Sequence, residues 1–121
     1  MPFRMILDAG VVAPENAALV GARSLDPPEV EYLGAMGIDD SLDRALDGVD
    51  ATYVALDLDV LDPAEIDVLI PEPDGFTADE LEAYLRELEG RTTVAGIGVT
   101  GFLATDRNTA VAARMLAAAG F

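Results

Sequence analysis

Two aspartates that follow an apolar run are the residues of this chain best suited to chemistry. Residues 53–56 read Tyr-Val-Ala-Leu, and Asp57 and Asp59 come next with one leucine between them. Because strand side chains alternate between two faces, residues two positions apart project from the same side. Two like charges at the end of a buried strand repel each other and resist desolvation, unless a cation that prefers oxygen ligands lies between them. The spacing therefore favours a metal-ligating carboxylate pair.

A structural interpretation of such acids stays open beside the chemical one. Acidic residues after a strand often cap a helix or face water. Asp62 stands before Pro63 and is more typical of a turn or cap than of a ligand. Arg23 favours a salt bridge with Asp26, or with an acid on another subunit, over catalysis. The aspartate pair is therefore the only metal site that we predict, and no residue is assigned to catalysis or to substrate binding.

An alternation of strands and helices must hold the aspartate pair in place. Strands are expected at residues 17–22, 51–57 and 93–99, with the second at the centre of the sheet. Helices are expected at residues 2–7, 77–90 and 108–118. A further helix should begin within residues 24–29 and end near Gly34 or Gly37, and another should begin within residues 39–41 and end at Gly48. Residues 2–7 also suit a short strand. This order implies an α/β fold with parallel strands, and in such sheets ligands bind at the carboxyl ends of the strands.

The region after the aspartates combines a long loop with a well-defined helix start. Residues 60–76 contain three prolines, each of which lacks a backbone donor, so a long loop is expected over the strand ends. Thr77 and Glu80 then have the spacing of a capping box, and an apolar stripe at helical spacing follows them. Loops of this length usually have a functional role.

Composition excludes several classes of function. The chain has 23 acidic and 7 basic residues, all of the latter arginine, and a formal net charge of −16, which disfavours nucleic acid as a partner. Its 51% hydrophobic content argues for a packed domain with an acidic exterior. The lack of cysteine excludes disulfides, thiolate metal sites and thiol nucleophiles. No apolar stretch approaches the roughly 20 residues of a membrane span, so a soluble, cytoplasmic protein without a membrane partner is expected.

Several segments together resemble the arginase/agmatinase, or ureohydrolase, family. Residues 57–63 read Asp-Leu-Asp-Val-Leu-Asp-Pro, and residues 71–77 read Pro-Glu-Pro-Asp-Gly-Phe-Thr before a helix. Residues 16–29 are similar to the family's aliphatic run with Gly-x-Arg and Asp-Pro, and residues 108–112 to the start of its C-terminal helix. The resemblance implies a three-layer αβα fold with a mainly parallel sheet, like the C-terminal half of the arginase fold, as one domain over residues 1–121.

The resemblance also implies a metal and a reaction. Ureohydrolases bind two manganese ions with six side chains, and Asp57 and Asp59 match two of these ligands. A hydroxide that bridges the ions attacks the guanidinium carbon of the substrate. The family's other ligands, a His and an Asp-x-His-x-Asp cluster, precede the matched part, and this chain has no histidine. Because Met1 and Pro2 resemble the family's Met-Pro segment, we expect a C-terminal half that binds manganese weakly or not at all by itself.

One segment departs from the family. Residues 96–102 read Gly-Ile-Gly-Val-Thr-Gly-Phe, whereas the family usually has an aspartate at the position of Gly98 and a glutamate that contacts the guanidinium at that of Gly101. Two functions therefore stay open. The first is the C-terminal part of a hydrolase of guanidino or amidino C–N bonds, inactive alone, with a small substrate bound only in a complete parent enzyme. The second is a non-catalytic α/β domain. Uncovered strand edges predict a homo-oligomer, or pairing with a missing N-terminal half.

Overall fold

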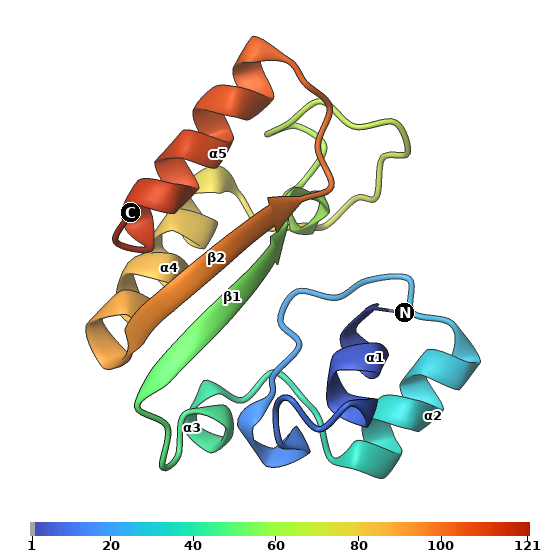
Figure 1. The fold of residues 1–121 in the computed structure, drawn as a ribbon. Coiled ribbons are helices and arrows are strands. Elements are labelled where there is room, and N and C mark those ends of the chain that lie inside the picture. Colours follow the sequence, from blue (N-terminus) through green and yellow to red (C-terminus); the bar gives the residue numbers. More distant parts are fainter. Residues whose placement is uncertain (1) are drawn as a thin grey trace. The chain divides into compact units, whose positions relative to one another are not determined.

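The structure is a computed structural model that describes residues 2–121, so Met1 of the expected Met-Pro segment lies outside the described residues. The chain divides into two compact units between Val49 and Asp50 (Figure 1). The first unit is helical and irregular, and the second contains the sheet. None of the helices in the described part of the chain is long and apolar enough to cross a membrane.

The first unit consists of short helices, two of which begin at capping side chains within the segments that the sequence indicates. Its elements are α1 (Pro2–Asp8), η1 (Pro14–Asn16), α2 (Pro27–Met36) and α3 (Leu42–Ala45). Helix α2 begins after Asp26, whose side chain accepts from the N–H of Glu29 while the Glu29 carboxylate accepts from the N–H of Asp26. This capping box satisfies two backbone donors that the helix itself leaves unpaired. Residues 2–7 belong to helix α1, which confirms the first of the two interpretations of that segment.

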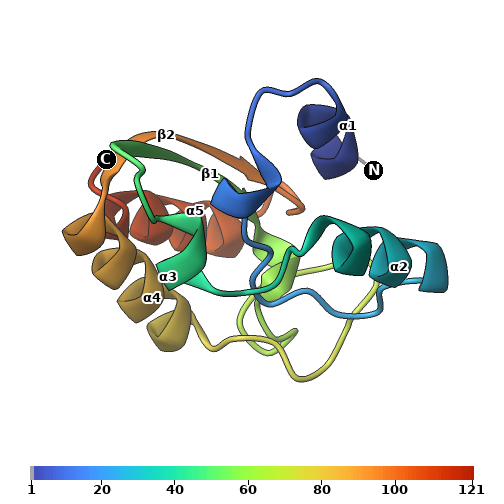
Figure 2. The same cartoon turned by 90° about the horizontal axis from the view of Figure 1, so that it is seen from below.

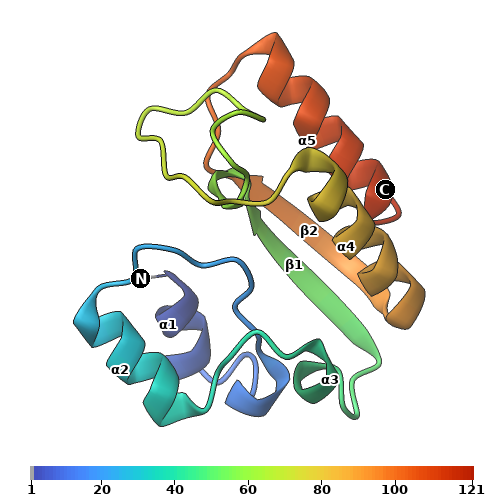
Figure 3. The same cartoon turned by 180° about the vertical axis from the view of Figure 1, so that it is seen from behind.

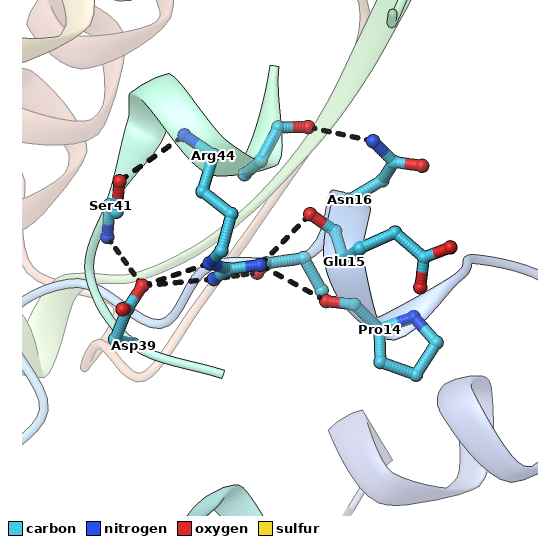
Figure 4. A network of polar contacts seen from close by, with 8 residues as sticks. Pro14, Glu15, Asn16, Asp39, Ser41 and Arg44 are labelled. Carbon is cyan, nitrogen blue, oxygen red and sulfur yellow. Dashed lines mark hydrogen bonds and ion pairs between the residues drawn. The ribbon is translucent and has the colours of Figure 1, made fainter. Parts of the chain in front are cut away.

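The expected strand at residues 17–22 is wrong for this chain. The segment is irregular, and its backbone groups find other partners. The Leu19 N–H donates to the Asp39 carbonyl oxygen at 2.9 Å, and the Arg44 guanidinium donates to the Ala17 carbonyl oxygen at 2.7 Å. The guanidinium also donates to the carbonyl oxygens of Pro14 (3.3 Å) and Glu15 (2.9 Å), which precede this segment (Figure 4). It also donates to the Asp39 carboxylate, and the Ser41 N–H and the Arg44 guanidinium hold the pKa of Asp39 below its usual value. An apolar run becomes a strand only where a second strand pairs with it.

The second unit is a two-stranded parallel sheet with helices on one face. Strands β1 (Ala51–Asp57) and β2 (Thr93–Thr100) lie side by side, with pairs that run from Ala51 and Thr93 to Asp57 and Thr100 (Figure 3). Helices α4 (Ala78–Arg91) and α5 (Asp106–Ala118) pack on each other and on the same side of the sheet (Figure 2). The buried core between them is formed by Leu56, Leu58, Leu61, Ile66, Ala78, Leu81, Leu85, Ala112, Met115 and Ala118.

Exposure alternates along β1, which corrects the prediction of a buried strand. Leu56 is buried and Val54 packs on the core, whereas Ala51, Tyr53, Ala55 and Asp57 are exposed. An apolar run predicts the strand but not how many of its faces are covered. The predicted bounds 51–57 are confirmed, and β2 extends one residue beyond the predicted Val99.

A network of ion pairs links helices α4 and α5 of the second unit. The Arg114 guanidinium on α5 donates to the carboxylates of Asp79 and Glu82 on α4, and Glu82 also accepts from Arg86 at 2.7 Å. Hydrogen bonds from Arg86 and then from Arg114 hold the pKa of Glu82 below its usual value. The same carboxylates raise the pKa of Arg114. Helix α4 begins at the predicted capping residue, because Thr77 accepts from the N–H of Glu80.

Candidate functional site

The two predicted metal ligands lie where β1 ends. Asp57 is the last residue of the strand, and Asp59 lies in the 3-10 turn η2 (Leu58–Val60) that follows. The Asp57 Oδ1 atom accepts the backbone N–H of Asp59 at 2.9 Å, so this carboxylate caps the turn. Both residues are exposed. The expectation that both project from one face of a strand is therefore corrected: they lie together in one strand-to-turn corner.

Gly101 makes room for the Asp57 carboxylate. Gly101 follows β2 and has a φ of 70°, which side-chain-bearing residues rarely adopt. A Cβ atom built there would lie 1.7 Å from Asp57 Oδ1, far inside van der Waals contact. The Asp57 carboxylate therefore lies directly against the Gly101 backbone, and no side chain fits at position 101 unless Asp57 moves.

Tyr53 occupies the space next to Gly98, the second glycine that departs from the family pattern. A Cβ atom at Gly98 would lie 2.6 Å from the Tyr53 hydroxyl, and one at Gly96 would lie 3.1 Å from the ring. The tyrosine therefore extends from β1 across the two glycines of β2. An aspartate at position 98 would need a different Tyr53 conformation.

The donors at this corner do not make a complete metal centre. Among residues 2–121, the structure brings no three histidine, cysteine, aspartate or glutamate side chains together as a group that could hold a metal ion. A hard cation such as Mn²⁺ takes about six oxygen or nitrogen ligands. Two exposed carboxylates, one of which already accepts a backbone hydrogen bond, fit part of such a site and not the whole of it.

The loop beside this corner is held by residues that sequence reasoning did not assign. The Asn108 side chain is fully buried at the start of α5, where it accepts from the N–H of Asp67 (2.8 Å) and donates to the carbonyl oxygens of Asp67 (2.8 Å) and Leu103 (3.1 Å). The Asp67 carboxylate accepts from Thr105 and Arg107. A lone asparagine in a helix start carries no signal for such a role.

Asp62 has the turn role that the sequence predicts. Its carboxylate accepts the N–H groups of Ala64 (3.0 Å) and Asp74 (3.2 Å), which joins the two ends of the loop. The N–H of Asp62 also donates to the carbonyl of Phe76 at 2.8 Å. Asp62 is therefore engaged in the turn, and the interpretation as a turn residue is confirmed.

The chain belongs to the arginase family, because residues 1–119 match the sequence pattern of that family. A stretch of 105 residues is 37% identical to the formimidoylglutamase of Halobacterium salinarum and covers 72% of this chain and 33% of that protein. The fold matches the formimidoylglutamase of Bacillus subtilis with a TM-score of 0.83 at 20% identity, over 98% of this chain and 45% of that one. It also matches a Trypanosoma cruzi formiminoglutamase solved with Mn²⁺, with a TM-score of 0.82 at 16% identity, over 97% of this chain and 48% of that one.

These matches confirm the predicted family and the predicted α/β fold with a parallel sheet. The chain spans about a third of the length of the curated relative and less than half of the solved structures.

Proposed function

We propose that this chain is the C-terminal part of a manganese-dependent, ureohydrolase-like hydrolase of guanidino or amidino C–N bonds. The observation that carries the proposal is the corner formed by Asp57 and Asp59 at the carboxyl ends of two parallel strands, in a chain of the arginase family. Ligands of α/β sheets bind at that edge. The relatives named as formimidoylglutamases favour a substrate with an amidine attached to an amino acid.

In this proposal the chain supplies part of a metal centre and the remaining ligands come from residues outside it. Manganese in such a centre would lower the pKa of a bound water and polarise the substrate. Asp57 and Asp59 would supply two anionic ligands, and Gly101 would leave the space that the Asp57 carboxylate needs. We therefore expect no turnover of arginine, agmatine or an amidino amino acid by this chain alone, with or without added manganese.

Titration with Mn²⁺, followed by paramagnetic broadening of backbone amide signals, tests the metal assignment directly. We expect selective broadening at residues 57–60, with saturation only at about millimolar Mn²⁺, because water must fill most of the coordination shell. Asp57→Asn and Asp59→Asn should each abolish this selectivity. The control Asp40→Asn removes an exposed carboxylate of the first unit and should leave it unchanged.

Two outcomes would contradict the assignment. Broadening spread evenly over the acidic surface would show that the corner has no preference for cations. Saturation at micromolar Mn²⁺ that survives Asp57→Asn would place the metal elsewhere. Saturation at micromolar Mn²⁺ that is lost in Asp57→Asn would keep the ligands but overturn the expectation of weak binding.

A second candidate function is that of a non-catalytic, self-associating α/β domain. One observation favours it: the face of the sheet that carries Tyr53 and Ala55 is exposed, although parallel sheets in proteins are normally covered on both faces. A second copy of the chain, or a polypeptide that supplies the N-terminal part of an arginase fold, would cover such a face.

A further inference from the structure

The chain contains two Asp-Gly steps, which are reactive points of a polypeptide backbone. They are Asp47-Gly48, between α3 and β1, and Asp74-Gly75, near the end of the loop that precedes α4. An aspartate before glycine can cyclise, because glycine has no side chain to hinder its backbone nitrogen and leaves the chain free to turn. Asp47, Gly48 and Asp74 are exposed, and Gly75 is half-buried. Exposure alone therefore does not separate the two steps.

The reaction at such a step is intramolecular and needs only water. The backbone nitrogen of the glycine loses its proton and attacks the Cγ atom of the aspartate, and the carboxyl hydroxyl leaves as water, which closes a succinimide ring. Water then adds to the main-chain carbonyl carbon of the aspartate, and the bond from that carbon to the glycine nitrogen breaks. The main chain now runs through Cβ and Cγ, which makes it one carbon atom longer and leaves a free α-carboxylate. Nothing is oxidised or reduced, and the net charge is unchanged.

The fold holds the Asp74-Gly75 step against a second segment of the chain. The Asp74 N–H donates to Asp62 Oδ2 (3.2 Å), and the Phe76 N–H donates to the Val60 carbonyl oxygen (3.0 Å), so the residues on both sides of Gly75 are attached to the start of the loop. A Cβ atom at Gly75 would lie 2.6 Å from three backbone atoms of that segment. The peptide between Asp74 and Gly75 therefore cannot turn, and no further carbon atom fits into it, unless the two ends of the loop separate.

The Asp47-Gly48 step is held by contacts that are local or exposed. The N–H groups of Asp47 and Val49 donate to the carbonyl oxygens three residues before them, at 3.3 and 3.1 Å, so these bonds belong to single turns. The Asn16 side chain donates to the Asp47 carbonyl oxygen at 3.1 Å in an exposed contact. A Cβ atom at Gly48 would meet no atom within 4 Å, so a longer main chain has room there. Exposed turns with few packed neighbours open at a low free energy, and we expect this step to cyclise without wider unfolding.

We propose that Asp47-Gly48 is a site at which the folded chain converts spontaneously to a β-linked aspartate, whereas the fold protects Asp74-Gly75. The proposal goes beyond the proposed hydrolase function and does not depend on it, because Asp47 belongs to the first unit and the aspartate pair of the metal corner to the second. The modified residue lies in the connection between α3 and β1, just before the boundary of the two units. Conversion therefore lengthens that connection by one carbon atom.

Prolonged incubation of the full chain at neutral pH tests the proposal, with a parallel sample in concentrated urea. Cleavage after arginine and glutamate places the two steps in separate peptides, 45–65 and 66–80, in which β-linked aspartate is resolved by chromatography and identified by electron-transfer fragmentation. The rate in urea divided by the rate in the folded chain gives a protection factor that is free of the effect of neighbouring side chains. This factor should be at least about tenfold larger at Asp74 than at Asp47, because hydrogen bonds to a distant segment must break first.

A variant that loosens the loop tests the cause of the protection. Asp62→Ala removes the acceptor of the Asp74 N–H and should raise the rate at Asp74 by about fivefold or more, with the rate at Asp47 unchanged. The matched control Glu87→Ala removes an exposed carboxylate of α4 and should change neither rate. Equal protection factors in the unmodified chain, or a larger one at Asp47, would overturn the proposal, and this comparison holds even if Asp62→Ala unfolds. An equal effect of Asp62→Ala on both steps in a folded variant would overturn it as well.

Discussion

Asn108→Ala should destabilise the second unit more than any other single side-chain deletion at the start of α5. The Asn108 side chain is fully buried and makes three hydrogen bonds, all to backbone groups of residues 67 and 103. Each buried polar group left without a partner costs about 1 to 3 kcal/mol. The Asp67 segment is only half-buried, so water can reach some of these groups once the side chain is gone. We therefore expect a loss of about 2 to 4 kcal/mol in the free energy of unfolding.

The effect can be measured globally and at the loop itself. With a urea m-value of about 2 kcal/mol per molar, the midpoint of the transition should fall by roughly 1 to 2 M. Hydrogen exchange of the Asp67 amide gives the local measure, since this N–H donates to Asn108 Oδ1. Its protection should drop by more than that of amides within β1. Thr109→Ala, an exposed substitution one residue along α5, is the control and should change stability by less than about 0.5 kcal/mol.

Two results would refute this reasoning about Asn108. One is a loss below about 0.5 kcal/mol, which would mean that the three hydrogen bonds contribute no more than a surface contact. The other is unchanged exchange at Asp67 despite global destabilisation, which would place the effect in the packing of α5 instead of the loop. Asn108→Asp separates these cases further, because it keeps the acceptor, loses both donor bonds and adds a buried charge. It should be at least as destabilising as alanine.

Two further predictions concern the corner of the sheet and the helix pair. Gly101→Ala should cost about 1 kcal/mol or more in stability from the positive φ alone, and should shift the Asp59 amide signal because the Asp57 carboxylate must move. The control is Gly90→Ala on α4, where a Cβ meets nothing within 4 Å, so this substitution should be neutral or stabilising. Equal effects of the two substitutions would contradict this prediction. The lowered pKa of Glu82 stabilises the fold above its unfolded pKa of about 4.3, and this contribution is lost as pH falls through the folded pKa. In thermal melts, Glu82→Gln should therefore be less stable than wild type at pH ~7, and the difference should shrink below pH ~4; a constant difference would refute the assignment.

The sequence predicts those elements that depend on neighbouring residues. The bounds of β1 follow from an apolar run that ends in acids, and the start of α4 follows from the spacing of Thr77 and Glu80. Residues 17–22 have an equally apolar pattern and yet form no strand, because strand pairing is decided by segments far away in the sequence. The family pattern identifies the aspartate pair, but local propensity does not show that the strand stops at Asp57 and that Asp59 belongs to a turn.

The remaining features of the site depend on contacts across the fold. The fit between Gly101 and Asp57 joins residues that lie more than forty positions apart, and so does the packing of Tyr53 on Gly98. In the sequence these glycines are visible only as departures from a family pattern. The structure gives a spatial reason for both departures, since each glycine leaves a space that a side chain of β1 fills.

The packing of Tyr53 on Gly98 also constrains the order in which this sheet can change over evolutionary time. The Cβ atom of an acid introduced at position 98 while tyrosine is still present would lie 2.6 Å from the hydroxyl, so the exposed ring would have to turn away. A smaller residue at position 53 would first open that space, after which the acid could be accepted. The two positions are therefore expected to show epistasis, because an acid at position 98 requires the ring to move only while tyrosine is present at position 53.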